Sequence, residues 1–404
     1  MRALLLRLRS WMGALGERGA GAIEYAGGTL LVGILISTAA FGVAATAPQL
    51  LGERLSGTIC RAFAVLPGVD PACADFGDIA GALPQEEGTA VPEEVPYEDT
   101  LWTYDQLTSG PMVFVGDSYG SGEGAGDYDP DTDRGPSWWD NLWGNDVPEN
   151  RCHRSGNAWG IQVGEQHWPG NYTFNACSGS VTADVENSNQ DGNDGEGPQG
   201  EDITADTAMI FVSMGGNDAG FAPILKECLA AALTNGQIRG QSGGMAPESA
   251  MIYCSTWLDQ PDPDANDGRS RRQVILDRVE ARIRTMYAYL REQSKDGAHI
   301  VQMGYPALFD PGYIGLIESK DVAYLNTLSA DLNAMIARVA KEQGIHFIDP
   351  TEAFADHGVG SDDPWLLGLG LGGNRALPPE AFHPNAAGQD AMQELIEEYL
   401  ASLK

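Results

Sequence analysis

Three short segments of the sequence place polar side chains beside glycines in patterns that suit acyl transfer. Ser118 stands in Gly-Asp-Ser-Tyr-Gly, directly after the apolar residues 112–116, where a sharp turn would expose its hydroxyl. Asn217 follows a second apolar run and a Gly-Gly pair, so its amide could donate a hydrogen bond across the end of a sheet. His383 precedes Pro384 near the C-terminus and could take a proton as a general base. A hydroxyl, an imidazole and a carboxamide are groups that serve nucleophilic attack on an ester.

Each segment also has a structural explanation when it is taken alone. A serine in a glycine-rich turn is often structural, Asn-Asp after a strand favours a turn, and His383 could cap the last helix. Gly-Asp-Ser-Tyr-Gly also fits the G-x-S-x-G elbow of α/β-hydrolases, but that fold needs several strands before its elbow, and Ser118 follows the first. The glycine run contains neither G-x-G-x-x-G nor Gly-Lys-Ser/Thr, so it does not predict a nucleotide site.

Apolar runs that alternate with amphipathic stretches predict the scaffold that positions these segments. The runs expected to form buried strands are 112–116, 172–176, 208–214, 299–303 and 346–348. The stretches expected to form helices are 220–233, 271–293, 321–342 and 386–403. This alternation predicts an α/β fold, a three-layer α/β/α sandwich around a parallel sheet, with catalytic groups at the carboxyl ends of the strands.

The three segments, in this order, resemble the SGNH (GDSL-type) hydrolases over about residues 110–403, and look closest to secreted actinobacterial esterases and lipases. A fourth family block, an oxyanion glycine, corresponds to Gly179 in Ala-Cys-Ser-Gly-Ser. The resemblance implies a flavodoxin-like fold and a serine esterase or lipase that needs no cofactor. It implies Ser118 as nucleophile and His383 as general base. It also implies an oxyanion hole built from the backbone N–H groups of Ser118 and Gly179 and the side chain of Asn217.

The third member of the expected triad departs from the family pattern. The family usually places aspartate three residues before the histidine, and this chain has Glu380 there. Glutamate can still accept the imidazole N–H, although its longer side chain requires a different rotamer. Some relatives orient the histidine with a backbone carbonyl instead. We expect Glu380 to fill this role, with the backbone carbonyl as the alternative.

Six cysteines leave the pairing open on sequence grounds, although an oxidising compartment favours disulfides. Chain order and the family resemblance imply three pairs: Cys152 with Cys177, Cys228 with Cys254, and Cys60 with Cys73. The sequence contains no C-x-x-C and no H-E-x-x-H, so a zinc site is not predicted. Acidic loops at 127–133 and 187–198 lack the glycine or the final glutamate of a calcium loop, and we expect no metal there.

The N-terminus predicts a membrane segment. Residues 1–19 carry four arginines and one glutamate, and residues 26–47 are uncharged and span about 33 Å as a helix, enough to cross a bilayer with the N-terminus in the cytoplasm. A cleaved secretory signal is the alternative. Gly19, followed by Glu24 and Tyr25, resembles a type IVb (Flp-like) prepilin signal, which implies a prepilin peptidase as a processing partner. The expected organisation is a basic leader (1–19), a transmembrane or pilin-like helix (20–47), an acidic tether (48–100) and a hydrolase domain (101–404).

Charge narrows the choice of partners. The chain has 24 Lys and Arg against 57 Asp and Glu, a net charge of −33, which repels phosphate backbones and argues against nucleic acid. We therefore predict an extracytoplasmic serine esterase or lipase, membrane-anchored or secreted, that acts on an acyl lipid or an acylated glycan. The alternatives are a carbohydrate O-acetylesterase of the same fold and a surface adhesin or appendage subunit that uses the fold for binding. Aromatic residues near the nucleophile could line a substrate site or belong to the core: Tyr119, Tyr128, Trp138, Trp139 and Trp143.

Overall fold

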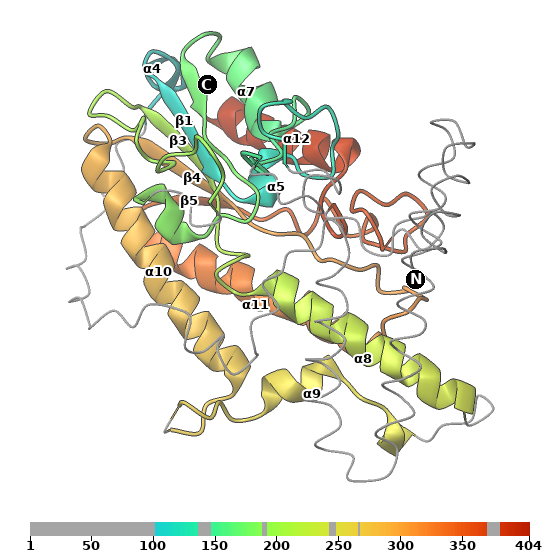
Figure 1. Cartoon of the computed structure of the whole chain (residues 1–404). Helices are drawn as coiled ribbons and strands as arrows, with labels where there is room; N and C mark the ends of the chain where they lie inside the picture. The colour runs from blue at the N-terminus through green and yellow to red at the C-terminus, as the bar shows by residue number, and fades with distance from the viewer. Residues whose placement is uncertain (1–101, 136–146, 188–191, 242–247, 266, 370–379) are drawn as a thin grey trace, which may run out of the picture. The chain divides into compact units, whose positions relative to one another are not determined.

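A computed structural model describes residues 102–135, 147–187, 192–241, 248–265, 267–369 and 380–404 (Figure 1). The predicted leader, membrane helix and tether lie outside these residues, as do Cys60, Cys73 and the tryptophans at positions 138, 139 and 143. Among the helices of the described ranges, none has both the length and the apolar character needed to cross a membrane.

Five parallel strands form the central sheet, in the order β2-β1-β3-β4-β5. They are β1 (Met112–Gly116), β2 (Tyr172–Phe174), β3 (Met209–Ser213), β4 (His299–Met303) and β5 (His346–Ile348). Every residue of β1 and β3 is buried, as expected for parallel strands covered on both faces. The chain runs outward from β1 in both directions, so the carboxyl ends of β1 and β3 flank the switch point where ligands bind in such sheets.

Helices cover both faces of the sheet (Figure 1). The α-helices are α4 (Tyr104–Thr108), α5 (Ser118–Ser121), α7 (Trp159–His167), α8 (Phe221–Gln241), α9 (Cys254–Asp259), α10 (Arg271–Gln293), α11 (Ser319–Glu342) and α12 (Ala386–Ser402). Two 3-10 turns, Thr182–Val185 and Glu248–Ala250, complete the set in the described ranges. Helices α7 and α12 pack against each other, and so do α10 and α11. The predicted three-layer α/β fold is confirmed.

Alternate residues of the strands face opposite layers. Val113 and Val115 join one buried core with apolar residues of α10 and α11. Phe114 points the other way, and its ring lies 4.5 Å from that of Trp159 in α7, centroid to centroid. A Cβ on Gly160 would come within 2.3 Å of the Phe114 ring, so only glycine allows α7 to approach the sheet this closely. The contact thus requires a glycine inside α7, and glycine lowers helix propensity. For this reason the sequence pattern did not predict α7.

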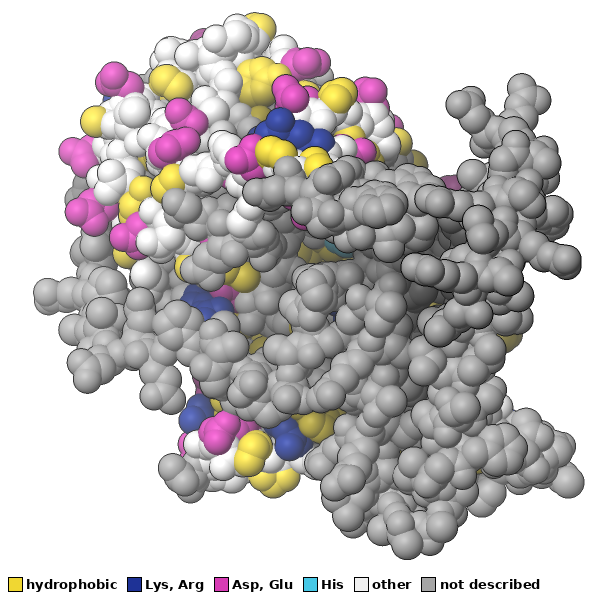
Figure 2. Space-filling model, in the orientation of Figure 1, with side chains coloured by type: hydrophobic (Ala, Val, Ile, Leu, Met, Phe, Trp, Pro, Cys, Tyr) yellow, Lys and Arg dark blue, Asp and Glu magenta, His cyan; other side chains and the backbone are white. Residues whose placement is uncertain are grey.

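In the described part of the surface that Figure 2 shows, acidic side chains are scattered among other side chains, and lysine and arginine side chains form a few small groups. Several of the chain's arginines are held in exposed ion pairs, such as Arg269 with Asp267 and Asp277. Such a surface repels polyanions and keeps a protein soluble, in line with the net charge of the whole chain.

At the amino ends of the strands, a half-buried histidine makes stability depend on pH. His299 begins β4 and hydrogen-bonds the Tyr399 hydroxyl, and the Tyr399 ring stacks on His346 with centroids 4.1 Å apart. Burial, followed by the charges of His346 and Arg291, lowers the pKa of His299 from 6.5 to about 4. Between these values the unfolded chain binds more protons than the folded one, so the free energy of unfolding falls as the pH falls.

Denaturant titrations of the wild type and His299→Gln test this dependence. Between pH 6.5 and pH 4 we expect the wild type to lose about 1–2 kcal/mol more unfolding free energy than the variant, after allowance for partial exposure of the ring. Carboxylates titrate in both proteins, so only the difference between the two curves reports on this imidazole. Parallel curves would show that His299 does not cause the loss of unfolding free energy at low pH.

Candidate active site

Ser118 is the first residue of the short helix α5, directly after β1. Asp117 caps that helix, because its carboxylate accepts a hydrogen bond from the Tyr119 N–H at 3.0 Å. The Asp117 N–H in turn donates to the Ser213 carbonyl of β3 at 2.8 Å. Ser118 is only 7% exposed and lies at the carboxyl edge of the sheet, beside the switch point. The turn that the glycine-rich motif predicted is therefore present at that edge.

His383 reaches this serine from the other end of the chain. Its Nε2 lies 2.8 Å from the Ser118 Oγ, although 265 residues separate the two. The residues beside them are also linked, since the Tyr119 hydroxyl donates to the Phe382 carbonyl at 2.6 Å. Phe382 has a φ of 68°, a strained value for a residue with a side chain, and the Tyr119 bond helps to hold that turn. A serine and an imidazole in hydrogen-bond contact form the geometry of an activated nucleophile.

Gly179 and Asn217 lie next to each other in the structure. Gly179 follows β2 in a left-handed turn with a φ of 84°, which glycine adopts without strain. Asn217 follows β3, and its Nδ2 donates to the carbonyl of Ser180, the next residue after Gly179, at 3.0 Å. The structure thus brings the loops of both predicted oxyanion residues together at the same edge of the sheet as Ser118.

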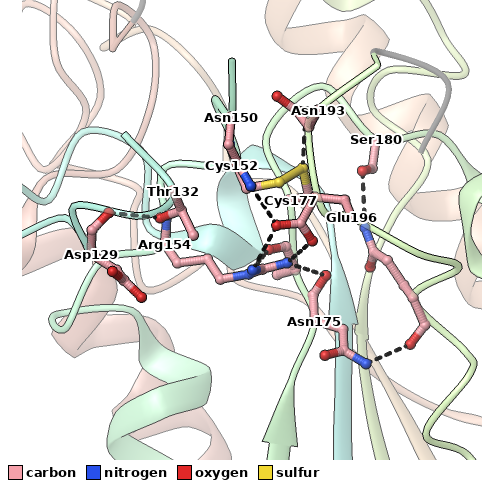
Figure 3. A network of polar contacts seen from close by, with 12 residues as sticks. Asp129, Thr132, Asn150, Cys152, Arg154, Asn175, Cys177, Ser180, Asn193 and Glu196 are labelled. Carbon is pink, nitrogen blue, oxygen red and sulfur yellow. Dashed lines mark hydrogen bonds and ion pairs between the residues drawn. A yellow bond between two sulfur atoms is a disulfide. The ribbon is translucent and has the colours of Figure 1, made fainter. Parts of the chain in front are cut away.

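A polar network and a disulfide brace the Gly179 loop (Figure 3). Cys152 and Cys177 are bonded, with their Cα atoms 4.0 Å apart. Arg154, two residues after Cys152, donates from Nε to the Ala176 carbonyl at 2.8 Å and pairs with Glu196 at 2.5 Å. The other predicted pair in the described ranges, Cys228 with Cys254, joins α8 to α9.

A buried tyrosine joins the nucleophile turn to the Asn217 loop. Tyr305 follows β4. Its hydroxyl accepts a hydrogen bond from the Gly216 N–H at 2.8 Å and donates one to Asp117 Oδ2 at 2.5 Å. Burial raises the pKa of Asp117 to about 7, although the hydrogen bonds from Tyr305 and Tyr119 act in the opposite direction. Sequence reasoning missed Tyr305, because it lies in a long loop without a motif.

Glu380 lies in the same turn as His383, but no carboxylate oxygen of the described residues hydrogen-bonds the histidine's second nitrogen. The His383 backbone N–H donates to the Glu380 carbonyl at 3.1 Å. His383 Nδ1 is buried and has no hydrogen-bond partner within the described ranges. Burial raises the pKa of Tyr128 to about 12, and the charge of Glu380 adds to this effect. The group that orients the imidazole therefore stays a prediction.

Of the aromatic residues expected near the nucleophile, Tyr119 and Tyr128 lie in the described ranges. The Tyr119 ring lies beside the His383 imidazole, with centroids 5.5 Å apart. Tyr128 supports the loop after α5, since its hydroxyl accepts from the Gly124 N–H at 2.8 Å. No cluster of three or more His, Cys, Asp or Glu side chains suited to a metal ion occurs in the part of the chain that the structure describes.

Comparison with known proteins identifies the family. Residues 114–391, more than half of the chain, match the GDSL-like Lipase/Acylhydrolase family. The chain belongs to this family. The resemblance inferred from the four sequence blocks is thereby confirmed, and the GDSL-family chain is a carboxylic ester hydrolase.

Relatives of this GDSL hydrolase come from Streptomyces. Lipase 1 of Streptomyces coelicolor is 29% identical over 279 residues, covering 69% of this chain and 81% of the relative. A lipase of Streptomyces rimosus is 28% identical over 281 residues, with the same two coverages. Among solved structures, an extracellular lipase from Streptomyces rimosus matches with a TM-score of 0.51 and 25% identity, over 72% of this chain and 99% of the other. Phospholipase A1 from Streptomyces albidoflavus matches with a TM-score of 0.52 and 24% identity, over 72% and 98%, and shares the fold.

Proposed function

We propose that this hydrolase cleaves its ester through an acyl-enzyme on Ser118, with His383 as the general base. The observation that carries the proposal is the 2.8 Å contact between His383 Nε2 and Ser118 Oγ. The serine proton moves to Nε2 as Oγ bonds to the acyl carbon, and the same proton passes to the departing alkoxide when the ester C–O bond breaks. Water, deprotonated by the same imidazole, then attacks the acyl carbon; the bond from that carbon to Oγ breaks, the acid is released, and Nε2 returns the proton to Ser118.

The oxyanion of each tetrahedral intermediate would be held by three hydrogen-bond donors. These are the backbone N–H groups of Ser118 and Gly179 and the side-chain amide of Asn217. A carboxamide has two N–H groups, and Asn217 uses one on the Ser180 carbonyl, so the other remains for the substrate oxygen. Such preorganised donors stabilise the transition state because they need no reorientation as charge develops.

The orienting group for His383 is part of the proposal. When Nε2 accepts the serine proton, Nδ1 must carry a hydrogen, and a buried N–H without an acceptor is costly. Glu380 stands in the turn that leads to His383 and is our choice for that acceptor in the working enzyme. A backbone carbonyl of the same turn is the alternative.

We place the enzyme outside the cytoplasm and assign it an acyl lipid as substrate. Two disulfides in the described domain suit an oxidising compartment. The relatives are lipases, and one of them is an extracellular lipase. The basic leader and the uncharged residues 26–47 support an anchored N-terminus, with processing after Gly19 by a prepilin peptidase.

A series of p-nitrophenyl esters from C2 to C16 tests the substrate class, with Ser118→Ala as control. We expect serine-dependent hydrolysis with an optimum at medium or long acyl chains. A sharp optimum at C2 would favour the O-acetylesterase alternative over the lipase. Flat rates that survive in Ser118→Ala would contradict the acyl-enzyme and favour a role in binding.

A further inference from the structure

Glu123 occupies a place in the site that no motif assigns. It stands between Gly122 and Gly124, whose φ values of 84° and 95° let the chain turn back on itself after α5. A Cβ on Gly124 would come within 2.9 Å of the Pro384 carbonyl and 3.1 Å of His383 Cβ. The Glu123 segment is therefore packed directly against the turn that carries His383. Its carboxylate is buried, with the side chain only 4% exposed.

Three polar side chains surround this carboxylate. The Ser178 hydroxyl donates to Oε2, and His153 Nδ1 lies at ion-pair distance from Oε1, 3.3 Å. His383 Nε2 lies 4.0 Å from Oε2. Burial alone would raise the pKa of Glu123, but His383, His153 and Ser178 together lower it below the ordinary value. Glu123 is therefore an ionised carboxylate inside the protein at neutral pH.

We propose that Glu123 is a positioning residue that acts through His383, with its negative charge stabilising the imidazolium that forms when Ser118 attacks the ester. This inference rests on the proposed acyl-enzyme mechanism. Glu123 takes no proton itself: the serine proton moves to His383 Nε2 and from there to the leaving alkoxide. What changes during the step is the charge 4.0 Å from the carboxylate, from a neutral ring to a cation. An opposite charge at about 4–6 Å favours the charged form.

Other charged groups affect the interaction between Glu123 and His383. The His153 ring lies beside the Tyr128 ring, and its Nε2, the nitrogen that faces away from Glu123, is 3.6 Å from Asp133 Oδ1. Burial lowers the pKa of His153, but Glu123 and Asp133 raise it by more, with Arg151 opposing them. A protonated His153 competes with His383 for the charge of Glu123. Ser118, Glu123 and Tyr119 all lie close to the His383 ring.

The same carboxylate has an opposing effect that the test must separate. Ser178 precedes Gly179, so the charge of Glu123 also acts on the proposed oxyanion hole, where negative charge is unfavourable. Because the imidazolium carries a full positive charge 4.0 Å from the carboxylate, we expect its stabilisation to dominate. A net rate increase on removal of the charge would contradict that expectation.

Glu123→Gln removes the charge and keeps the shape. We expect the plateau of kcat/KM on a p-nitrophenyl ester to fall about 10- to 100-fold, and the acid-side midpoint of the pH profile to move about one unit lower. Glu123→Asp keeps the charge and should keep the wild-type midpoint. Ser178→Ala is the matched control, because it removes the hydrogen bond and leaves the carboxylate. A rate loss without a shifted midpoint would show that Glu123 only supports the fold.

An NMR titration makes the inference independent of turnover. The ring proton of His383, assigned by its loss in His383→Gln, should titrate at lower pH in Glu123→Gln than in the wild type. If Glu123→Gln does not fold, His153→Gln supplies the test, since the carboxylate then acts on His383 alone and the midpoint should rise. An unchanged midpoint in the folded variant would overturn the inference. Absence of Ser118-dependent turnover in the wild type would overturn the proposed function instead, while the titration would still report on the Glu123–His383 pair.

Discussion

Replacing Ser118 with alanine is expected to lower kcat/KM for a p-nitrophenyl ester by about 10⁴- to 10⁶-fold. The variant loses the nucleophile, so neither the covalent intermediate nor the proton transfer to His383 can take place. The side chain is small and almost buried, and its removal should leave thermal stability close to that of the wild type. Steady-state kinetics together with a fluorophosphonate label, which attaches to an activated serine, measure the effect directly.

His383→Ala should be about as damaging, and the double variant no worse than either single one, because the two residues act as a unit. Glu380→Gln should lose less, since an amide oxygen can still accept the Nδ1 hydrogen. Equal and near-total loss in all three single variants would show that the Glu380 charge is indispensable. Retention of more than a tenth of the wild-type rate in Ser118→Ala would mean that another residue attacks the ester.

The second large effect is expected at Asn217. Asn217→Ala removes one oxyanion donor and should lower kcat about 100- to 1,000-fold, equivalent to about 2.7–4 kcal/mol of transition-state stabilisation, with little change in KM. The loss falls on kcat because the donor is expected to bind the tetrahedral oxyanion more strongly than the ground-state carbonyl.

Asn217→Asp is the control, because it keeps the size of the side chain and replaces the donor by a negative charge. We expect it to be at least as inactive as Asn217→Ala. Both variants also lose the bond to the Ser180 carbonyl, so their melting temperatures must be compared with that of the wild type. A decrease in kcat of less than about tenfold, with reduced stability, would show that the Asn217 amide serves only the Gly179 loop.

The elements with a strong local pattern were predicted well. The bounds of β1, β4, β5 and α10 agree with those expected from apolar periodicity. Helix α8 is longer than predicted, since its amphipathic pattern weakens after Leu233 while the helix continues to Gln241. Helix α7 was missed because Gly160 and Gly164 make its sequence a poor helix former, and both glycines are needed for contact with Phe114 and Tyr172.

The reactive groups themselves could be inferred from neighbouring residues. Ser118, Asn217 and His383 each stand beside glycine or proline at the end of a predicted element, and a turn of that kind is determined by residues close in sequence. Their order along the chain, shared with the family, was therefore enough to indicate ester chemistry. The sequence by itself therefore indicated which residues carry a hydroxyl, an imidazole or an amide at the edge of the sheet.

The arrangement around those groups depends on packing between distant segments. The contact of Ser118 with His383 joins residues 265 positions apart, and it exists because β1 and the turn before α12 meet at one edge of the sheet. Glu123 and Tyr305 carry no motif, and their roles follow only from what surrounds them. The ionisation and orienting effect of a buried carboxylate are set by the charges within a few ångströms, and those neighbours are known only after the chain has folded.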